Sequence, residues 1–258
     1  MNNILQGANS WSDFKESISA LNTKEKGDAF EAFTQHYLRL DPKYALILKE
    51  VWHYKEVPPN IRQELNLPTL DEGIDLVAQT KAGGFWAIQC KYREDETQSL
   101  TRRELSTFTD LTFGICKNFE FALVCTTTSR FSSKLKAYGG RIGFCASDVW
   151  WALPKEYFQR LHDVLRGKQA SLKAFRPRPH QKVAMSLAKN HFVENKCTRG
   201  KLIHPCGTGK SLTSYWIAND LRARTILIAV PSLSLIRQTV AEWAREYLAS
   251  QTSVSWLA

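Results

Sequence analysis

Two apolar runs joined by a glycine-bearing turn, in the stretch from Glu72 to Lys91, constrain the fold more than any other part of the chain. Residues 74–78 and 85–91 are rich in apolar side chains, and residues 81–84 carry two glycines. This pattern predicts two strands joined by a tight loop. The loop sets the register of the pair, so it also sets where the polar residues of the two runs lie relative to each other.

Three polar residues of this hairpin are expected to meet. Asp75 stands near the start of the first strand, while Gln89 and Lys91 lie two apart on the second and so share a face. Magnesium prefers oxygen ligands and takes few of them from the protein. The Asp75 carboxylate, the Gln89 side-chain oxygen and the Cys90 carbonyl would supply them. Lys91 would hold and help deprotonate an attacking water and offset charge on a phosphate. The pattern predicts phosphodiester hydrolysis.

The same residues also have a purely structural interpretation. Asp75 would then simply end a strand, and Lys91 would be a solvated residue at a sheet edge. Most single Asp and Lys residues in strands are of that kind. The order of the acid, the Gln-x-Lys triplet and an upstream Gly-x-x-Phe-Glu favours the catalytic interpretation.

Four segments carry a resemblance to a known family: Lys26-Gly-Asp-Ala-Phe-Glu31, Gly73-Ile-Asp75, Gln89-Cys-Lys91, and 121–128 followed by Arg130-Phe-Ser-Ser-Lys134. From about Gly27 to about Asp148 the chain resembles the PD-(D/E)xK nucleases, specifically the Mrr-like restriction endonucleases. The resemblance implies a restriction-endonuclease-like α/β sandwich with a central mixed sheet, Mg²⁺ as cofactor, and Glu31 as a further site residue. Gln89 stands where most members of the superfamily carry an acid, which leaves two-metal occupancy open.

Charge is distributed unevenly along the chain. Residues 1–165 carry 20 Lys and Arg against 21 Asp and Glu, whereas residues 166–258 carry 15 against 4. The basic excess therefore belongs to the C-terminal third. A surplus of that size indicates a polyanionic partner, and double-stranded DNA is the partner we expect.

Other classes of protein fit the sequence poorly. No apolar run is long enough for a membrane span, and the N-terminus lacks the charged start and apolar core of a signal peptide. The six cysteines show no Cys-x-x-Cys spacing, so neither a zinc site nor disulfides are expected. We expect a cytoplasmic protein without membrane contact.

The resemblance implies a nuclease domain over 1–165, the basic, Gly- and Pro-containing composition indicates a linker over 166–178, and a further domain is expected over 179–258. Within the first domain we expect these elements in order: helices at 11–21 and 23–40, a strand at 44–54, a proline-bearing connection at 58–70, the hairpin, a helix at 102–113, a strand at 121–125, a helix at 132–138 and a strand at 141–145. Together they describe a sheet flanked by helices.

Basic residues outside the hairpin are candidates for contacts with DNA phosphates, and each alone would ordinarily be a solvated charge. The candidates are Arg102, Arg103, Arg130, Lys134, Lys136 and Arg141. The adjacent Trp150 and Trp151 are interpreted as core residues rather than as a platform for bases.

A second motif begins at Lys201, where an apolar run, expected to be a strand, leads into Gly207-Thr208-Gly209-Lys210-Ser211. Glycine-rich loops of this kind bind nucleotide phosphates through backbone N–H groups, with the lysine on the outer phosphates and the hydroxyl on Mg²⁺. The strict phosphate-loop pattern has a glycine where this chain has His204. An ordinary strand-to-helix turn is the structural alternative.

The flanking segments explain the departure. Together with the loop, Phe175-Arg-Pro-Arg-Pro-His-Gln181 and Ile226–Gln238 resemble three ordered motifs of superfamily 2 (DEAD/DEAH-type) helicases. The resemblance implies a RecA-like α/β domain, ATP as ligand, an adenine contact from Gln181, and a strand and DNA-contacting loop at 226–238. No Asp-Glu-x-[His/Asp] motif follows, so we expect a partial domain with weak nucleotide binding at most and no ATPase activity.

The two resemblances together indicate the N-terminal part of an ATP-dependent restriction enzyme, with methyltransferase or specificity parts in a longer chain or a partner. Two other functions stay open. One is a DNA-binding module that does not cleave, and the other is a repair or junction nuclease of the same fold. Metal-dependent nicking of plasmid separates the first from an endonuclease, and the form of the DNA substrate separates the second.

Overall fold

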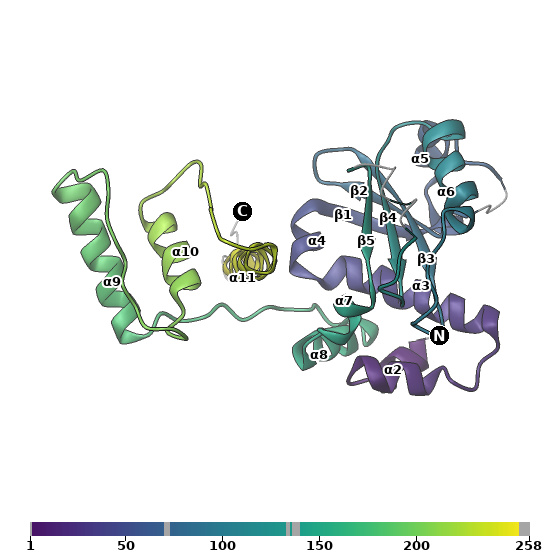
Figure 1. The fold of residues 1–258 in the computed structure, drawn as a ribbon, viewed down its shortest axis with the longest axis horizontal. Helices are drawn as coiled ribbons and strands as arrows, with labels where there is room; N and C mark the ends of the chain where they lie inside the picture. Colours follow the sequence, from purple (N-terminus) through teal and green to yellow (C-terminus); the bar gives the residue numbers. More distant parts are fainter. Residues whose placement is uncertain (1, 70–72, 133–134, 136–139, 253–258) are drawn as a thin grey trace. The chain divides into compact units, whose positions relative to one another are not determined.

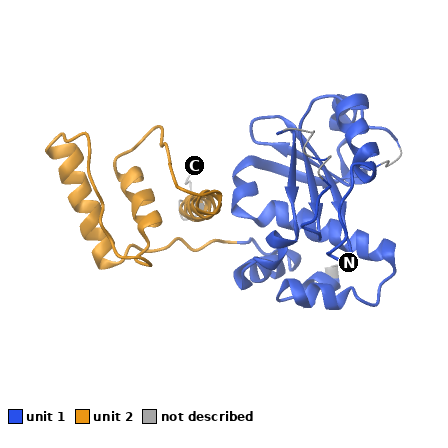
Figure 2. Ribbon diagram, viewed as in Figure 1, with its two compact units in different colours: residues 1–170 blue, residues 171–258 orange. Residues whose placement is uncertain are grey.

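The computed structural model describes residues 2–69, 73–132, 135 and 140–252, and the chain forms two compact units, residues 1–170 and 171–258 (Figure 2). Each unit is described by itself. The expected helix at 132–138, with Lys134 and Lys136, falls mostly outside the described residues, as does Glu72.

A five-stranded sheet forms the centre of the first unit (Figure 1). Its strands, which lie in the order β1-β2-β3-β4-β5, are β1 (Leu48–His53), β2 (Leu76–Thr80), β3 (Phe85–Lys91), β4 (Phe119–Thr126) and β5 (Ile142–Cys145). The first two pairs are antiparallel, and β3, β4 and β5 run parallel. The expected mixed sheet is confirmed.

The predicted hairpin is formed by β2 and β3. Strand β3 has the expected bounds, whereas β2 begins two residues later than expected and ends at Thr80. Gly83 in the turn has φ +99°, a conformation that favours glycine. Ile88 pairs with Leu76, so the end of β3 lies beside the start of β2. Polar residues at these two strand ends are therefore brought to one edge of the sheet.

Helices of the N-terminal segment and of residues 147–165 pack with one face of the sheet in a single apolar core. They are α1 (Asn2–Gly7), α2 (Trp11–Ser17), α3 (Thr23–Leu40), α4 (Pro42–Ile47), α7 (Ser147–Trp151) and α8 (Lys155–Leu165). Helix α3 has the expected bounds because Asn22 and Glu25 form a capping box at its start. Trp150 is fully buried in this core, as expected, but Trp151 is 53% exposed.

The opposite face packs against α5 (Pro59–Leu65), the 3₁₀ turns η1 (Tyr54–Glu56) and η2 (Arg103–Leu105), α6 (Ser106–Asp110) and the π-helical turn η3 (Leu111–Ile115). The proline-bearing connection expected over 58–70 contains helix α5, and Pro59 occupies the first turn of this helix, where proline is tolerated. The helix expected over 102–113 is present as three short helical pieces.

The second unit contains α9 (Pro179–Lys189), the π-helical turn η5 (Asn190–Glu194), α10 (Lys210–Asp220) and α11 (Leu233–Thr252). The expected strands at 201–204 and 226–230 are absent from the described part of this unit. A strand needs a neighbour for its ladder of hydrogen bonds. Neither segment has such a neighbour here, and Ile203 and Leu227 remain 87% and 94% exposed. Among the described helices, none is both long and apolar enough for a membrane crossing.

Candidate functional site

Asp75, Gln89 and Lys91 come together at one edge of the sheet in the first unit. Asp75 directly precedes β2, and the other two residues end β3, which runs antiparallel to β2. The Asp75 N–H donates to the Ile88 carbonyl at 3.0 Å, which continues the pairing past the end of the ladder. The hairpin register therefore places the acid beside the Gln-x-Lys triplet.

The Asp75 carboxylate is fixed against β3. Its Oδ2 accepts a hydrogen bond from the Cys90 N–H at 2.5 Å. Because the N–H and C=O of one strand residue point to the same side, the Cys90 carbonyl is directed toward the edge where Asp75 lies. The two oxygens that the sequence assigned to a metal site thus share one edge.

Gln89 is 2% exposed, and its amide has a defined orientation. Nε2 donates to the Gly73 carbonyl at 2.9 Å, while Oε1 is buried without a hydrogen-bond partner among the described residues. A buried acceptor without a donor costs free energy unless something else satisfies it. A bound cation beside Asp75 would do so.

Lys91 is half-buried, and its backbone is anchored to the end of β4. Its carbonyl accepts hydrogen bonds from Thr126 Oγ1 at 2.9 Å and from the Thr127 N–H at 3.3 Å. Both threonines are fully buried. The strand end that carries the lysine is therefore rigidly held.

Glu31 reaches the same region from α3, which packs on β3. Burial raises the pKa of the Cys90 thiol well above its usual range, and the nearby carboxylates of Asp75 and Glu31 raise it further. Both acids thus lie close to Cys90 from two different elements. The sequence placed Glu31 in the site by resemblance, and the structure brings it to this neighbourhood.

The donor set suits a hard divalent cation. Two carboxylates, an unpartnered amide oxygen and a backbone carbonyl are all oxygen donors, as Mg²⁺ requires. The described residues contain no group of three His, Cys, Asp or Glu side chains placed to hold a metal. A cation held by these donors would have oxygen ligands, unlike the sulfur and nitrogen ligands of a structural zinc centre.

Gly73 and Phe108 complete the wall of the site, and the sequence reasoning had not assigned Phe108 a place there. A Cβ atom on Gly73 would lie 3.4 Å from Gln89 Nε2 and 3.6 Å from the Phe108 backbone nitrogen. Gly73 also has φ +129°, which disfavours other residues. Helix α6 therefore closes over the amide of Gln89.

The glycine-rich loop of the second unit leads into α10, as expected. Gly207 and Gly209 have φ +76° and +80°, and Gly209 is the N-cap of α10. Lys210 Nζ donates to the carbonyls of His204 and Pro205 at 3.1 and 3.0 Å. The lysine thus spans the loop from inside, and Thr208 Oγ1 also donates to the Pro205 carbonyl.

Gln181 lies under this loop and is 4% exposed. Its Nε2 donates to the Thr208 carbonyl and to Thr213 Oγ1, and its Oε1 accepts from the Arg178 N–H. The amide supports the loop in the structure, and the adenine contact stays a prediction. A Cβ atom on Gly209 would lie 2.7 Å from Gln181 Nε2, so close packing also requires glycine there.

Ser211, the expected magnesium ligand of the loop, meets a residue that sequence reasoning missed. The Trp243 indole N–H of α11 donates to the Ser211 carbonyl at 3.1 Å and to its Oγ at 3.2 Å. No local pattern indicates this contact, because the two residues are 32 positions apart.

The described candidates for phosphate contacts are exposed: Arg102, Arg103, Arg130 and Arg141. The Arg141 guanidinium lies 4.1 Å from the ring centre of Phe113. The role of these arginines in DNA binding stays a prediction.

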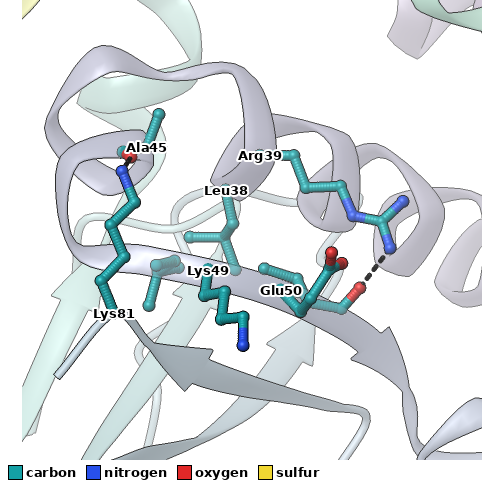
Figure 3. Close-up of a pocket in the computed structure, with 8 residues that line it drawn as sticks. Leu38, Arg39, Ala45, Lys49, Glu50 and Lys81 are labelled. Carbon is teal, nitrogen blue, oxygen red and sulfur yellow. Dashed lines mark hydrogen bonds between the residues drawn. The ribbon is translucent and has the colours of Figure 1, made fainter. Parts of the chain in front are cut away.

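A hollow of about 470 Å³ lies along the edge strand β1 (Figure 3). Its lining includes Arg39, Lys49, Glu50 and Lys81. Arg39 Nη2 donates to the Val51 carbonyl, and Lys81 Nζ donates to the Ala45 carbonyl. Arg39 thus covers a carbonyl of the edge strand β1 and Lys81 a carbonyl of helix α4, and none of the expected site residues lines the hollow.

Comparison with known proteins supports two domains of different kinds. Residues 39–139 match the family model of a restriction endonuclease, and residues 174–255 match that of the type III restriction enzyme res subunit. The first match includes Asp75, Gln89 and Lys91 but begins after Glu31. No curated protein matches the chain.

Among solved structures, the chain is similar to the ATP-dependent type ISP restriction-modification enzyme LlaBIII bound to DNA, with 24% identity and a TM-score of 0.66. The similarity covers 92% of this chain and 15% of that one. It supports the fold. A protein of unknown function is also similar, with 14% identity over 85% of this chain and 99% of the other and a TM-score of 0.32.

Proposed function

We propose that this chain, which contains a restriction endonuclease domain followed by a helicase-like res-subunit domain, cleaves double-stranded DNA in a Mg²⁺-dependent reaction as the nuclease part of an ATP-dependent restriction enzyme. The observation that carries the proposal is the buried, unpartnered Oε1 of Gln89, the residue next to Cys90, whose N–H holds the Asp75 carboxylate. Most buried side-chain amides have hydrogen-bond partners at both ends, and a bound cation would supply the missing one here.

The residues that would hold the metal are Asp75, Gln89 and Glu31 through side-chain oxygens and Cys90 through its carbonyl. When bound, Mg²⁺ polarises a phosphoryl oxygen and lowers the pKa of a bound water. With Gln89 where an acid could stand, the described side-chain ligands carry two negative charges, which favours a single bound cation.

The chain's own residues orient the reactants. Lys91, held by its backbone at the end of β3, would place its ammonium group near the attacked phosphate and offset the charge that develops there. Hydrolysis forms a bond from the water oxygen to phosphorus and breaks one phosphorus–oxygen ester bond, which leaves a phosphate end and a hydroxyl end. The Cys90 N–H keeps the Asp75 carboxylate in its orientation.

The second unit is proposed to bind nucleotide through the loop from Gly207 to Ser211. Its glycines point the backbone toward the start of α10, and Lys210 occupies the inside of the loop with bonds to carbonyl oxygens. A nucleotide phosphate would compete for the lysine with these neutral acceptors. The charge on phosphate favours the exchange.

A plasmid assay tests the nuclease proposal. The purified 258-residue chain is incubated with supercoiled plasmid in Mg²⁺, in Ca²⁺ and in EDTA, beside Asp75→Asn and the control Glu64→Gln, an exposed acid on α5. We expect Mg²⁺-dependent nicking or linearisation by the parent and by the control only. DNA binding without cleavage in Mg²⁺ would support the non-cleaving module instead. Preference for branched over linear duplex would support a junction nuclease.

A further inference from the structure

Arg93 lies next to the hairpin site and has no assigned role there. It follows Lys91 by two residues, and its backbone is tied to the end of β4, since its N–H donates to Thr127 Oγ1 at 2.7 Å and its carbonyl accepts from the same hydroxyl at 2.8 Å. The backbone at Arg93 is thus held like that of Lys91.

The Arg93 side chain, in contrast to its backbone, is held by Glu104, which pairs with the guanidinium. This carboxylate, on η2, forms an ion pair with Arg93 Nη2, and Gln98 Oε1 accepts from Nη1 at 3.4 Å. Glu104 is itself fixed, because the Thr101 N–H and hydroxyl donate to its Oε2 at 2.9 and 2.8 Å. Partial burial would raise the pKa of Glu104, but these hydrogen bonds and the Arg93 cation outweigh it and lower the pKa. The acid therefore stays charged.

The pair is close to the metal-binding edge. Turn η2 leads directly into α6, whose Phe108 backbone lies beside Gly73 and the amide of Gln89. Glu104 stands four residues before Phe108, about one helical turn. The guanidinium has five N–H groups, of which one on Nη1 and one on Nη2 have partners in the described structure. One N–H on each of these two nitrogens is left for a phosphate, whereas the unpartnered Nε is buried.

We propose that Arg93 binds a DNA phosphate adjacent to the cleaved bond, and that Glu104 is the positioning residue that presents its guanidinium. The inference rests on the proposed nuclease function and adds a second cation to the site beside Lys91. Arginine suits this task, because its planar fork binds phosphate through two parallel N–H groups while a third stays on the carboxylate.

The test compares Arg93→Gln, Arg93→Lys and Glu104→Gln with the parent and with Lys117→Gln. Lys117 is exposed and precedes β4, at the end of the sheet away from the site. DNA binding is measured in Ca²⁺ over a range of salt concentrations. Each lost phosphate contact lowers the slope of log affinity against log salt by about 0.9. We expect that loss of slope for Arg93→Gln and an unchanged slope for Arg93→Lys. For Lys117→Gln we expect a slope close to that of the parent, because this variant removes a positive charge but no phosphate contact.

Cleavage in Mg²⁺ supplies the second readout. Arg93→Gln and Arg93→Lys should both lose about tenfold or more in rate, because lysine restores charge but not the fork. Glu104→Gln should bind DNA as tightly as the parent or more tightly and yet cleave more slowly. A purely structural ion pair would lower thermal stability and leave the salt slope alone, and that result would overturn the inference. If the parent does not cleave, the nuclease proposal fails, while the slope still decides the phosphate contact.

Discussion

Replacing Asp75 separates the chemical role of its carboxylate from its structural role, because one oxygen accepts the buried Cys90 N–H at 2.5 Å. Asp75→Asn keeps an oxygen acceptor and removes the charge, whereas Asp75→Ala removes both. Leaving a buried donor unsatisfied costs about 1–3 kcal/mol. In a unit of about 170 residues, each kcal/mol shifts the melting temperature by about 2–4 °C. We therefore expect Asp75→Ala to melt about 2–12 °C below the parent and Asp75→Asn to melt much closer to it.

Cleavage should respond differently from stability. Both variants lose a charged metal ligand. Removal of one electrostatic group costs other enzymes about 10²–10³-fold in rate, so both variants should lose at least that much activity. Melting is followed by differential scanning calorimetry, and cleavage by plasmid relaxation in Mg²⁺. Glu64→Gln serves as the control for loss of an acid. If Asp75→Asn cleaves plasmid at a rate near that of the parent, the assignment of Asp75 as a metal ligand is refuted.

Three further outcomes are expected. Gln89→Glu places a carboxylate against the Gly73 carbonyl, so the metal-free protein should melt lower, Mg²⁺ should restore it more than it stabilises the parent, and cleavage should persist; a melting temperature indifferent to Mg²⁺ would contradict a ligand role. Burial, followed by the nearby Arg39 and His53, lowers the pKa of His36 to about 4. The neutral, buried His36 side chain contributes fully to stability above the unfolded pKa of about 6.5, and the free energy of unfolding should fall by up to about 3 kcal/mol toward pH 4. Urea unfolding measured over this pH range should show a smaller loss for His36→Gln than for the parent. Lys210→Ala should bind a fluorescent ATP analogue at least about tenfold more weakly, since the outer phosphates lose their charged partner; DNA-stimulated phosphate release by the parent but not by this variant would contradict the expectation that the chain lacks ATPase activity.

Local patterns determined a large part of the first unit. Helix α3 and strand β3 have the expected bounds, because a capping box marks the start of the helix and a glycine turn marks the start of the strand. Asp75, Gln89 and Lys91 could be placed together from the hairpin alone, since its register follows from the turn. The two-domain interpretation also came from motifs that are contiguous in sequence.

Other features depended on partners distant in the chain. The extended segments at 201–204 and 226–230 have the composition of strands, yet whether such a segment becomes a strand depends on a neighbour that its own residues do not specify. The proline-bearing connection expected at 58–70 contains a helix that its own sequence pattern did not predict, and Ile61 and Leu65 of this helix are buried in the core on one face of the sheet.

The details of the site were decided only by the tertiary structure. The pairing of Arg93 with Glu104, the bond from Cys90 to Asp75 and the place of Phe108 beside Gly73 join residues 11 to 35 positions apart. Hydrophobic periodicity indicates which face of a strand or helix is buried, but it does not say which elements meet or at what depth. The unpartnered oxygen of Gln89 is a property of that packing, because the surrounding side chains and backbone determine which of its atoms find partners.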